Sequence, residues 1–137
     1  MSWRVVPRLV VRSYAAAEAF YCGKLGFEWI AEGGDPPSLG TFGRDGVQIG
    51  VQEPSVATPE RAVGLGMVDL HVPALVALRD AIRAAGVEIE SETTTGPVDE
   101  ETMEPIAAAC RLCEFTIRDP DGNLLAFRQA EDGASGG

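Results

Sequence analysis

Hydrophobic and polar positions along the chain follow a pattern that occurs twice. In the first half, a β-branched run over residues 5–11 precedes an Ala-rich helical stretch. Ser13 is the candidate N-cap of this helix and Gly26 its C-terminal stop. In the second half, an alternating apolar run over residues 67–72 precedes a second helical stretch. The pattern predicts a strand followed by a helix in each half.

The second helix is predicted from apolar residues at helical spacing. Pro73 is its candidate first residue, and Gly86 with Val87 closes it. Four residues share its apolar face: Leu75, Leu78, Ile82 and Ala85. Each half then carries an Asp-Gly turn before a strand, Asp45-Gly46 before residues 47–51 and Asp121-Gly122 before residues 124–127.

The spacing of these signals indicates an internal repeat. Val11 lies 61 positions before Val72, Gly26 lies 60 before Gly86, and Gly46 lies 76 before Gly122. The last offset is longer by about 16 residues, because residues 91–109 form a Thr-, Glu- and Pro-rich stretch expected to be a loop. We therefore expect one α+β domain over residues 1–130, made of a module at about 4–53, a linker at 54–64 and a module at about 65–130. Residues 131–137 are expected to form a flexible tail.

Composition and charge narrow the class of protein. With 137 residues, 45% of them hydrophobic and 23% charged, the chain is long enough for one domain with a core. The net charge of −10 argues against nucleic-acid and anionic-membrane partners, although it permits a cationic ligand. No signal peptide or transmembrane segment is recognisable, and three cysteines are too few for a disulfide scaffold. The expected compartment is the cytoplasm.

Two motifs in this order resemble one protein family. Residues 9–12, Phe20-Tyr21 and residues 25–27 look like the opening of the vicinal oxygen chelate superfamily, and residues 118–125 look like its closing hairpin. That superfamily contains glyoxalases, bleomycin-resistance proteins, fosfomycin-resistance enzymes and dioxygenases. The resemblance covers about residues 4–130. It implies two βαβββ modules that form a cupped mixed sheet around a pocket, and a homodimer.

The resemblance also locates the metal ligands of the family, which are His, Gln or Glu at equivalent points of the two modules. Counted along this chain, those points fall on Val6, Gly50, Met67 and Ala126. None of these side chains offers a hard donor to a divalent cation. We therefore expect no metal and no cofactor.

Strand alternation predicts which side chains line the pocket instead. Residues two apart on a strand share a face. The polar residues at even spacing from the four ligand positions should therefore face the cavity with them. The predicted ligand-binding residues are Arg8, Gln48, Gln52, Asp69, His71 and Arg128. His71 is the only histidine, and Asp69 lies two residues before it on the same predicted face.

Two functional hypotheses from different classes follow. The first is a metal-free protein, similar to the bleomycin-resistance members, that binds a cationic or aromatic small organic molecule such as an antibiotic. The second is an enzyme of the same fold, a lyase, isomerase or transferase, that uses His71, Asp69 or a cysteine. Cys110 and Cys113 have CxxC spacing, but no second pair completes a zinc site, so packing is the preferred interpretation. No catalytic residue is assigned.

Overall fold

The computed structural model describes residues 3–130, so the predicted tail at residues 131–137 lies outside the described residues. The chain divides into two compact units. Unit 1 runs to Val68 and includes Arg118–Leu125, whereas unit 2 contains Asp69–Ile117 and the residues from Ala126 onward. Among residues 3–130, no helix has the length and apolar character needed to cross a membrane.

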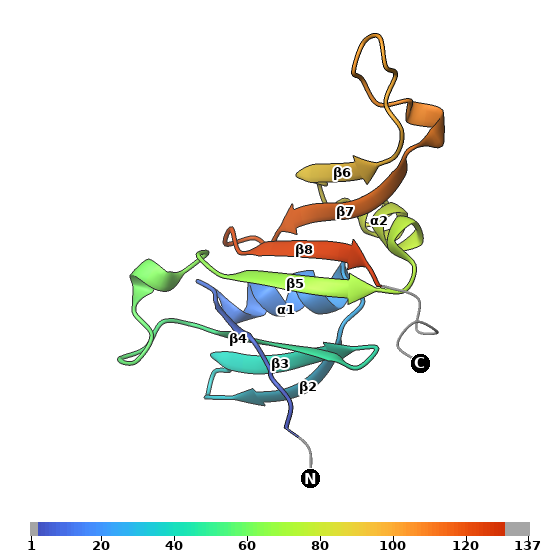
Figure 1. Ribbon diagram of the computed structural model, residues 1–137. Helices are drawn as coiled ribbons and strands as arrows, with labels where there is room; N and C mark the ends of the chain where they lie inside the picture. Colours follow the sequence, from blue (N-terminus) through green and yellow to red (C-terminus); the bar gives the residue numbers. More distant parts are fainter. Residues whose placement is uncertain (1–2, 131–137) are drawn as a thin grey trace. The chain divides into compact units, whose positions relative to one another are not determined.

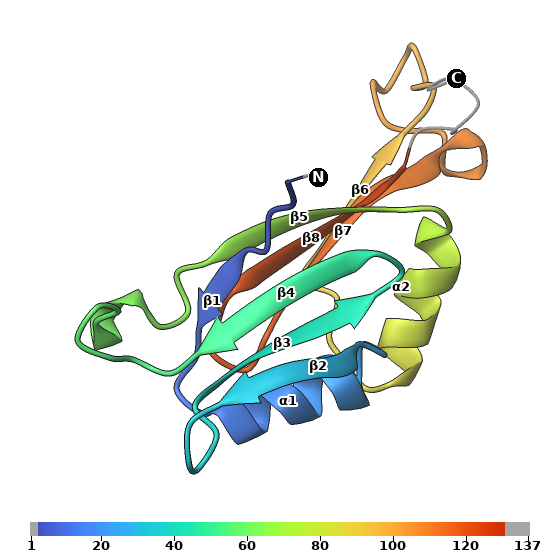
Figure 2. The same cartoon turned by 90° about the horizontal axis from the view of Figure 1, so that it is seen from below.

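The first sheet contains four strands in the order β1-β4-β3-β2. The strands are β1 (Arg8–Val10), β2 (Glu28–Gly33), β3 (Leu39–Arg44) and β4 (Val47–Gln52). Strand β1 is parallel to β4, while the β2–β3 and β3–β4 pairs are antiparallel. Helix α1 (Tyr14–Gly23) packs against one face of this sheet (Figure 2).

Helix α1 begins where the sequence predicts, and it buries one face against the sheet. The Ser13 hydroxyl accepts a hydrogen bond of 3.2 Å from the Ala16 amide, which confirms the N-cap. After the helix, Gly26 has a φ of 74°, a conformation that favours glycine. The buried helix residues are Tyr14, Ala17, Phe20 and Tyr21. The large apolar side chains buried on β1, β3 and β4 are Leu9, Phe42, Ile49 and Val51.

The second sheet has the order β5-β8-β7-β6 (Figure 1). Its elements are β5 (Met67–Val72), α2 (Leu75–Ala84), β6 (Ser91–Thr95), β7 (Arg111–Arg118) and β8 (Leu124–Gln129). Short 3₁₀ turns occur at Glu60–Ala62 and Ala107–Ala109. Element for element, this order repeats that of the first sheet. The predicted α+β fold of two βαβββ modules is therefore confirmed.

The expected loop over residues 91–109 is partly wrong, because its first five residues form β6. Ser91–Thr95 pairs antiparallel with β7, with Ser91 opposite Thr116 and Glu92 opposite Phe115. All five residues are exposed, so the apolar alternation that marks a buried strand is missing. Threonine nevertheless favours extended backbone.

The start of α2 also differs from the prediction, which placed it at Pro73. The helix begins at Leu75, whose amide donates a hydrogen bond of 3.1 Å to the Gln129 side-chain oxygen. The Gln129 side-chain nitrogen in turn donates to the Pro73 carbonyl at 2.7 Å. A side chain from β8 therefore sets the helix start, which local sequence could not reveal.

The turn between β7 and β8 is held by two buried polar residues. Asp119, which is 4% exposed, accepts hydrogen bonds from the amides of Asp121 and Asn123, the Tyr21 hydroxyl and the Asn123 side chain, all at 2.9 Å. Asn123, which is fully buried, also donates to the Val10 carbonyl at 3.1 Å and accepts from the Gly66 amide at 2.8 Å. This network belongs to unit 1. It gives the closing Asp-Pro-Asp-Gly-Asn motif a structural role.

Candidate functional site

The face of the first sheet that is turned away from α1 carries polar residues at alternate positions. Ile49 and Val51 are buried, whereas Gln48 and Gln52 belong to the opposite face of β4. We call this the open face of the first sheet. The open face carries polar residues on β1 and β4 and on β3 and β2, the other strands of this sheet.

Two of the predicted ligand-binding residues contact each other on this face. The Arg8 guanidinium donates a hydrogen bond of 2.8 Å to the Gln52 side-chain oxygen, and the Gln52 nitrogen donates to the Thr58 hydroxyl at 2.7 Å. Gln52 is only 8% exposed, while Arg8 is exposed. A buried amide with both ends bonded is fixed in orientation, so it holds the Arg8 side chain in place.

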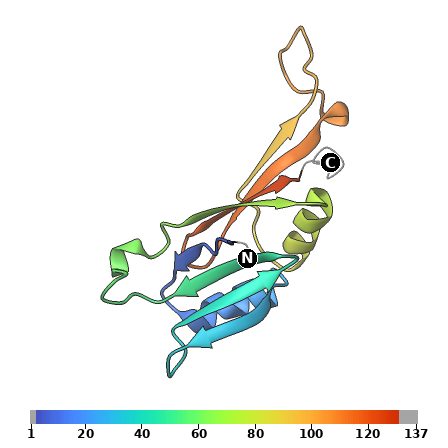
Figure 3. The same ribbon diagram turned by 60° about the horizontal axis from the view of Figure 1, so that its bottom comes forward.

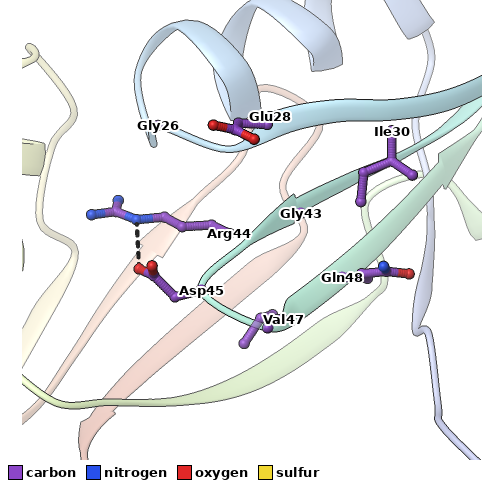
Figure 4. A pocket seen from close by; sticks show the side chains of 9 residues that line it. Gly26, Glu28, Ile30, Gly43, Arg44, Asp45, Val47 and Gln48 are labelled. Carbon is purple, nitrogen blue, oxygen red and sulfur yellow. Dashed lines mark hydrogen bonds and ion pairs between the residues drawn. The ribbon is translucent and has the colours of Figure 1, made fainter.

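Gln48 lies apart from this pair, in a depression of about 520 Å³ at the other end of β4 (Figure 4). Glu28 and Ile30 of β2, Gly43 and Arg44 of β3, and Asp45 of the following turn also line it. Asp45 and Gly46 have φ values of 49° and 86°, as expected for an Asp-Gly hairpin turn with two left-handed residues. The depression belongs entirely to unit 1.

The strands of the second sheet run from yellow-green to red in the ribbon of Figure 3. This sheet has its own row of charged side chains, on the face opposite the buried Val68 and Leu70. Asp69 and His71 lie on β5, with 3.6 Å between the Asp69 Oδ2 and His71 Nε2 atoms. Arg128 of β8 lies 3.6 Å from Asp69 through its Nε atom and 3.1 Å from Glu114 of β7 through its Nη2 atom. The sheet therefore brings Asp69, His71 and Arg128 together.

Three neighbours of the predicted residues were not identified from the sequence. Glu114 pairs with Arg128, Thr58 fixes Gln52, and Glu28 lines the depression beside Gln48. Glu114 alternates with the buried Phe115 and Ile117, so strand periodicity could have placed it on the charged face. Thr58 lies in the linker, where no periodic signal exists.

The positions that the resemblance assigns to metal ligands do not fit a divalent cation. Val6 precedes β1, Gly50 lies on β4, Met67 is 68% exposed at the start of β5, and Ala126 is buried on β8. None of the four side chains has an oxygen or nitrogen donor, and a thioether binds only soft metals. In the described part of the chain, no three His, Cys, Asp or Glu side chains cluster as metal ligands.

The cysteines of the described residues are free thiols. The Cys113 thiol donates to the Thr93 carbonyl at 3.2 Å, and the Cys110 thiol lies 3.8 Å from the Pro97 carbonyl. Burial, together with the nearby Glu18 carboxylate, raises the pKa of Cys22. A raised pKa lowers the thiolate population and makes Cys22 a poor nucleophile.

Comparison with known proteins supports the fold assignment. The family model of the glyoxalase/bleomycin resistance protein/dioxygenase superfamily matches residues 4–127. A glyoxalase/bleomycin resistance protein from Catenulispora acidiphila is 24% identical with a TM-score of 0.68, covering 94% of this chain and 99% of that one. Curated proteins give no significant match.

Two further solved structures differ in function from each other. A bleomycin-binding protein complexed with bleomycin is 17% identical with a TM-score of 0.63, covering 95% of this chain and 100% of that chain. A mutant of the fosfomycin resistance protein FosX from Listeria monocytogenes, complexed with Mn(II), is 17% identical with a TM-score of 0.59, covering 95% and 91%. Identities this low show the fold and leave the activity open. The chain belongs to the glyoxalase/bleomycin resistance protein/dioxygenase superfamily.

Proposed function

We propose that the protein binds a small organic molecule without a metal ion. The proposed ligand-binding residues are Arg8, Gln48, Gln52, Asp69, His71 and Arg128. One observation carries the proposal: strands of both sheets display ordered polar side chains, while the four family ligand positions hold Val, Gly, Met and Ala. Such surfaces can orient a ligand through hydrogen bonds but cannot activate it through a metal.

The polar groups are suited to binding because neighbours already hold them in place. Arg8 is positioned by Gln52, which Thr58 fixes in turn, and Arg128 is positioned by Asp69 and Glu114. A side chain that is ordered before binding loses less conformational entropy when the ligand arrives. Apolar contacts supply most of the affinity in sites of this kind, and a few polar groups set the orientation.

The class of ligand is inferred from the net charge of the chain and from a solved structure with the same fold. The net charge of −10 favours the approach of a cationic molecule. The bleomycin-binding relative was solved with bleomycin, which supports an antibiotic or a similar organic molecule as the ligand here. The proposal includes a homodimer in the cytoplasm, where free thiols are maintained.

The alternative is an enzyme that uses His71 with Asp69. The 3.6 Å separation between His71 Nε2 and Asp69 Oδ2 is longer than a hydrogen bond. The His71 side chain is 60% exposed, so a substrate in solution can reach it. An enzyme would form product in a His71-dependent reaction, whereas a binding protein captures its ligand without turnover.

A thermal-shift screen tests the proposal, with divalent metals, glycopeptide and aromatic antibiotics, and thiol adducts as probes. A ligand that binds only the folded state raises the melting temperature. A hit is then titrated against His71→Ala and Gln52→Ala, with the exposed Glu88→Ala as control. We expect each site variant to lose about 1–2 kcal/mol of binding free energy and the control to lose none. Unchanged affinity in both site variants, with the fold intact, would contradict the proposal.

A further inference from the structure

The depression at the end of β4 contains a row of three residues from three neighbouring strands. Glu28 of β2 lies opposite Gly43 of β3, which lies opposite Gln48 of β4. Directly opposed residues point to the same side of a sheet, so the Glu28 and Gln48 side chains flank a position without a side chain. Gly43 therefore leaves space between a carboxylate and an amide.

An irregularity in β2 adds an apolar wall to this space. The register shifts between Trp29 and Ala31, so Ile30 is an extra residue in the strand. Its side chain reaches over Gly43: a Cβ atom added to Gly43 would lie 2.5 Å from Ile30 Cδ1. Figure 4 shows Ile30, Gly43 and Gln48 around the hollow. Any larger residue at position 43 would displace Ile30.

The charges that line the depression leave one carboxylate uncompensated. Arg44 and Asp45 pair with each other at 3.3 Å, and Arg44 also donates to the Leu25 carbonyl at 2.7 Å (Figure 4). Within residues 3–130, neither Glu28 nor Gln48 makes a side-chain hydrogen bond or ion pair. The hollow therefore offers three unused acceptor atoms, two from the carboxylate and one from the amide, beside an apolar wall.

We propose that this depression binds the protonated amino or amidino end of an organic ligand, with Glu28 and the Gln48 side-chain oxygen accepting its hydrogen bonds and Ile30 packing on the adjoining carbon atoms. A protonated amine presents several N–H donors, which match the unused acceptors. The volume of about 520 Å³ falls in the range of small-molecule sites. This inference rests on the proposed function, because it assigns the ligand class to one part of the same open face.

Nitrogen-15 NMR titrations of the full chain test the assignment with benzylammonium as the probe and benzyl alcohol as its uncharged counterpart. We expect benzylammonium to shift the backbone amides of Gly43 and Gly46 and the side-chain amide of Gln48. We expect Glu28→Gln, which keeps the shape and removes the charge, to weaken binding about tenfold. The matched control Glu88→Gln removes the same charge from an exposed position outside the depression, so it should leave affinity unchanged.

The outcomes separate this inference from the proposed function. Equal binding of benzyl alcohol, equal affinity in Glu28→Gln and wild type, or no shift at Gly43 and Gln48 would each overturn the ammonium site. Such a result leaves the antibiotic titrations with His71→Ala and Gln52→Ala as an independent test of ligand binding elsewhere. Conversely, localised benzylammonium binding that Glu28→Gln weakens supports the site even where the thermal-shift screen finds no antibiotic.

Discussion

Arg8 and Gln52 form a hydrogen-bonded pair across the parallel strands β1 and β4, and the repeat places an equivalent pair on β5 and β8. Arg8 and Asp69 are 61 residues apart, the same offset that separates Val11 from Val72. Gln52 and Arg128 are 76 residues apart, the same offset that separates Gly46 from Gly122. Asp69 and Arg128 are ion-paired at 3.6 Å. Each module therefore retains one cross-strand polar pair at the same structural position, although neither residue type is shared.

Gly40→Ala is expected to destabilise the protein. A Cβ atom at this position would lie 2.5 Å from the Tyr14 hydroxyl oxygen and 2.9 Å from the Ala31 carbonyl oxygen, so the core must shift. Overpacking of this kind costs about 1–3 kcal/mol. The matched control Gly23→Ala meets nothing within 4 Å and lies in α1, so it should be neutral or stabilising. Urea denaturation measures the free energy of unfolding of both variants. Equal values for Gly40→Ala and Gly23→Ala would contradict the expected steric overlap at position 40.

Asp119→Asn is expected to lower the free energy of unfolding by about 2–4 kcal/mol, because two buried donors lose their acceptor. Each Asp119 carboxylate oxygen accepts two hydrogen bonds, and an amide nitrogen can accept none. Asp121→Asn makes the same charge change in the same turn. Its carboxylate accepts an exposed bond from the Arg12 amide, so a much smaller loss is expected. Chemical denaturation measures the free energy of unfolding of both variants. Similar losses in the two would show that the buried hydrogen bonds of Asp119 do not stabilise the protein more than the exposed bond of Asp121.

Alkaline pH is expected to destabilise the protein through Tyr21. Burial of the hydroxyl, and then the neighbouring Asp119 carboxylate, raise the pKa of Tyr21 above its ordinary value of about 10. The stabilisation is complete below the unfolded pKa, and it decreases as pH rises above about 10, because only the unfolded chain then loses the proton. The slope approaches about 1.4 kcal/mol per pH unit. Tyr21→Phe should be less stable at neutral pH yet show a flatter decline between about pH 10 and 11.5, and an unchanged slope would argue against this assignment.

Purified protein is expected to contain no stoichiometric zinc, nickel, iron or manganese. The family ligand positions hold Val6, Gly50, Met67 and Ala126, which lack hard donor atoms. Elemental analysis after mild chelation provides the measurement. About one metal ion per chain would show that the protein binds metal through other residues and that the positional assignment is wrong.

We expect a homodimer in solution at micromolar concentration. Strands β2 and β6 are terminal in their sheets, and a free strand edge favours association unless it is protected. Two-fold dimers are the commonest homo-oligomers. Light scattering coupled to size exclusion gives the mass directly. A mass of about 14.5 kDa would rule out the dimer.

The sequence predicted those parts of the fold that local chemistry determines. The Ser13 cap and the Asp45-Gly46 turn depend on a few adjacent residues, and both occur as expected. Strand β6 was missed because Ser91–Thr95 has no buried side that would produce apolar alternation. The partners of the candidate residues were also missed. Glu114 meets Arg128 only through the register of the second sheet. Glu28 lies in one row with Gln48 only through the register of the first sheet, where β2 carries the bulge at Ile30.

The β7–β8 turn has a consequence for synthesis of the chain on the ribosome. Within unit 1, Asp119 accepts from the Tyr21 hydroxyl, and Asn123 bonds the Val10 carbonyl and the Gly66 amide. Both residues are translated more than 50 residues after Gly66. A nascent chain that ends before Asp119 leaves these polar groups without their native partners. The amino-terminal repeat therefore gains these hydrogen bonds only after Asp119 and Asn123 of the carboxy-terminal repeat have been translated. The late-translated turn thus completes the polar contacts of segments made much earlier.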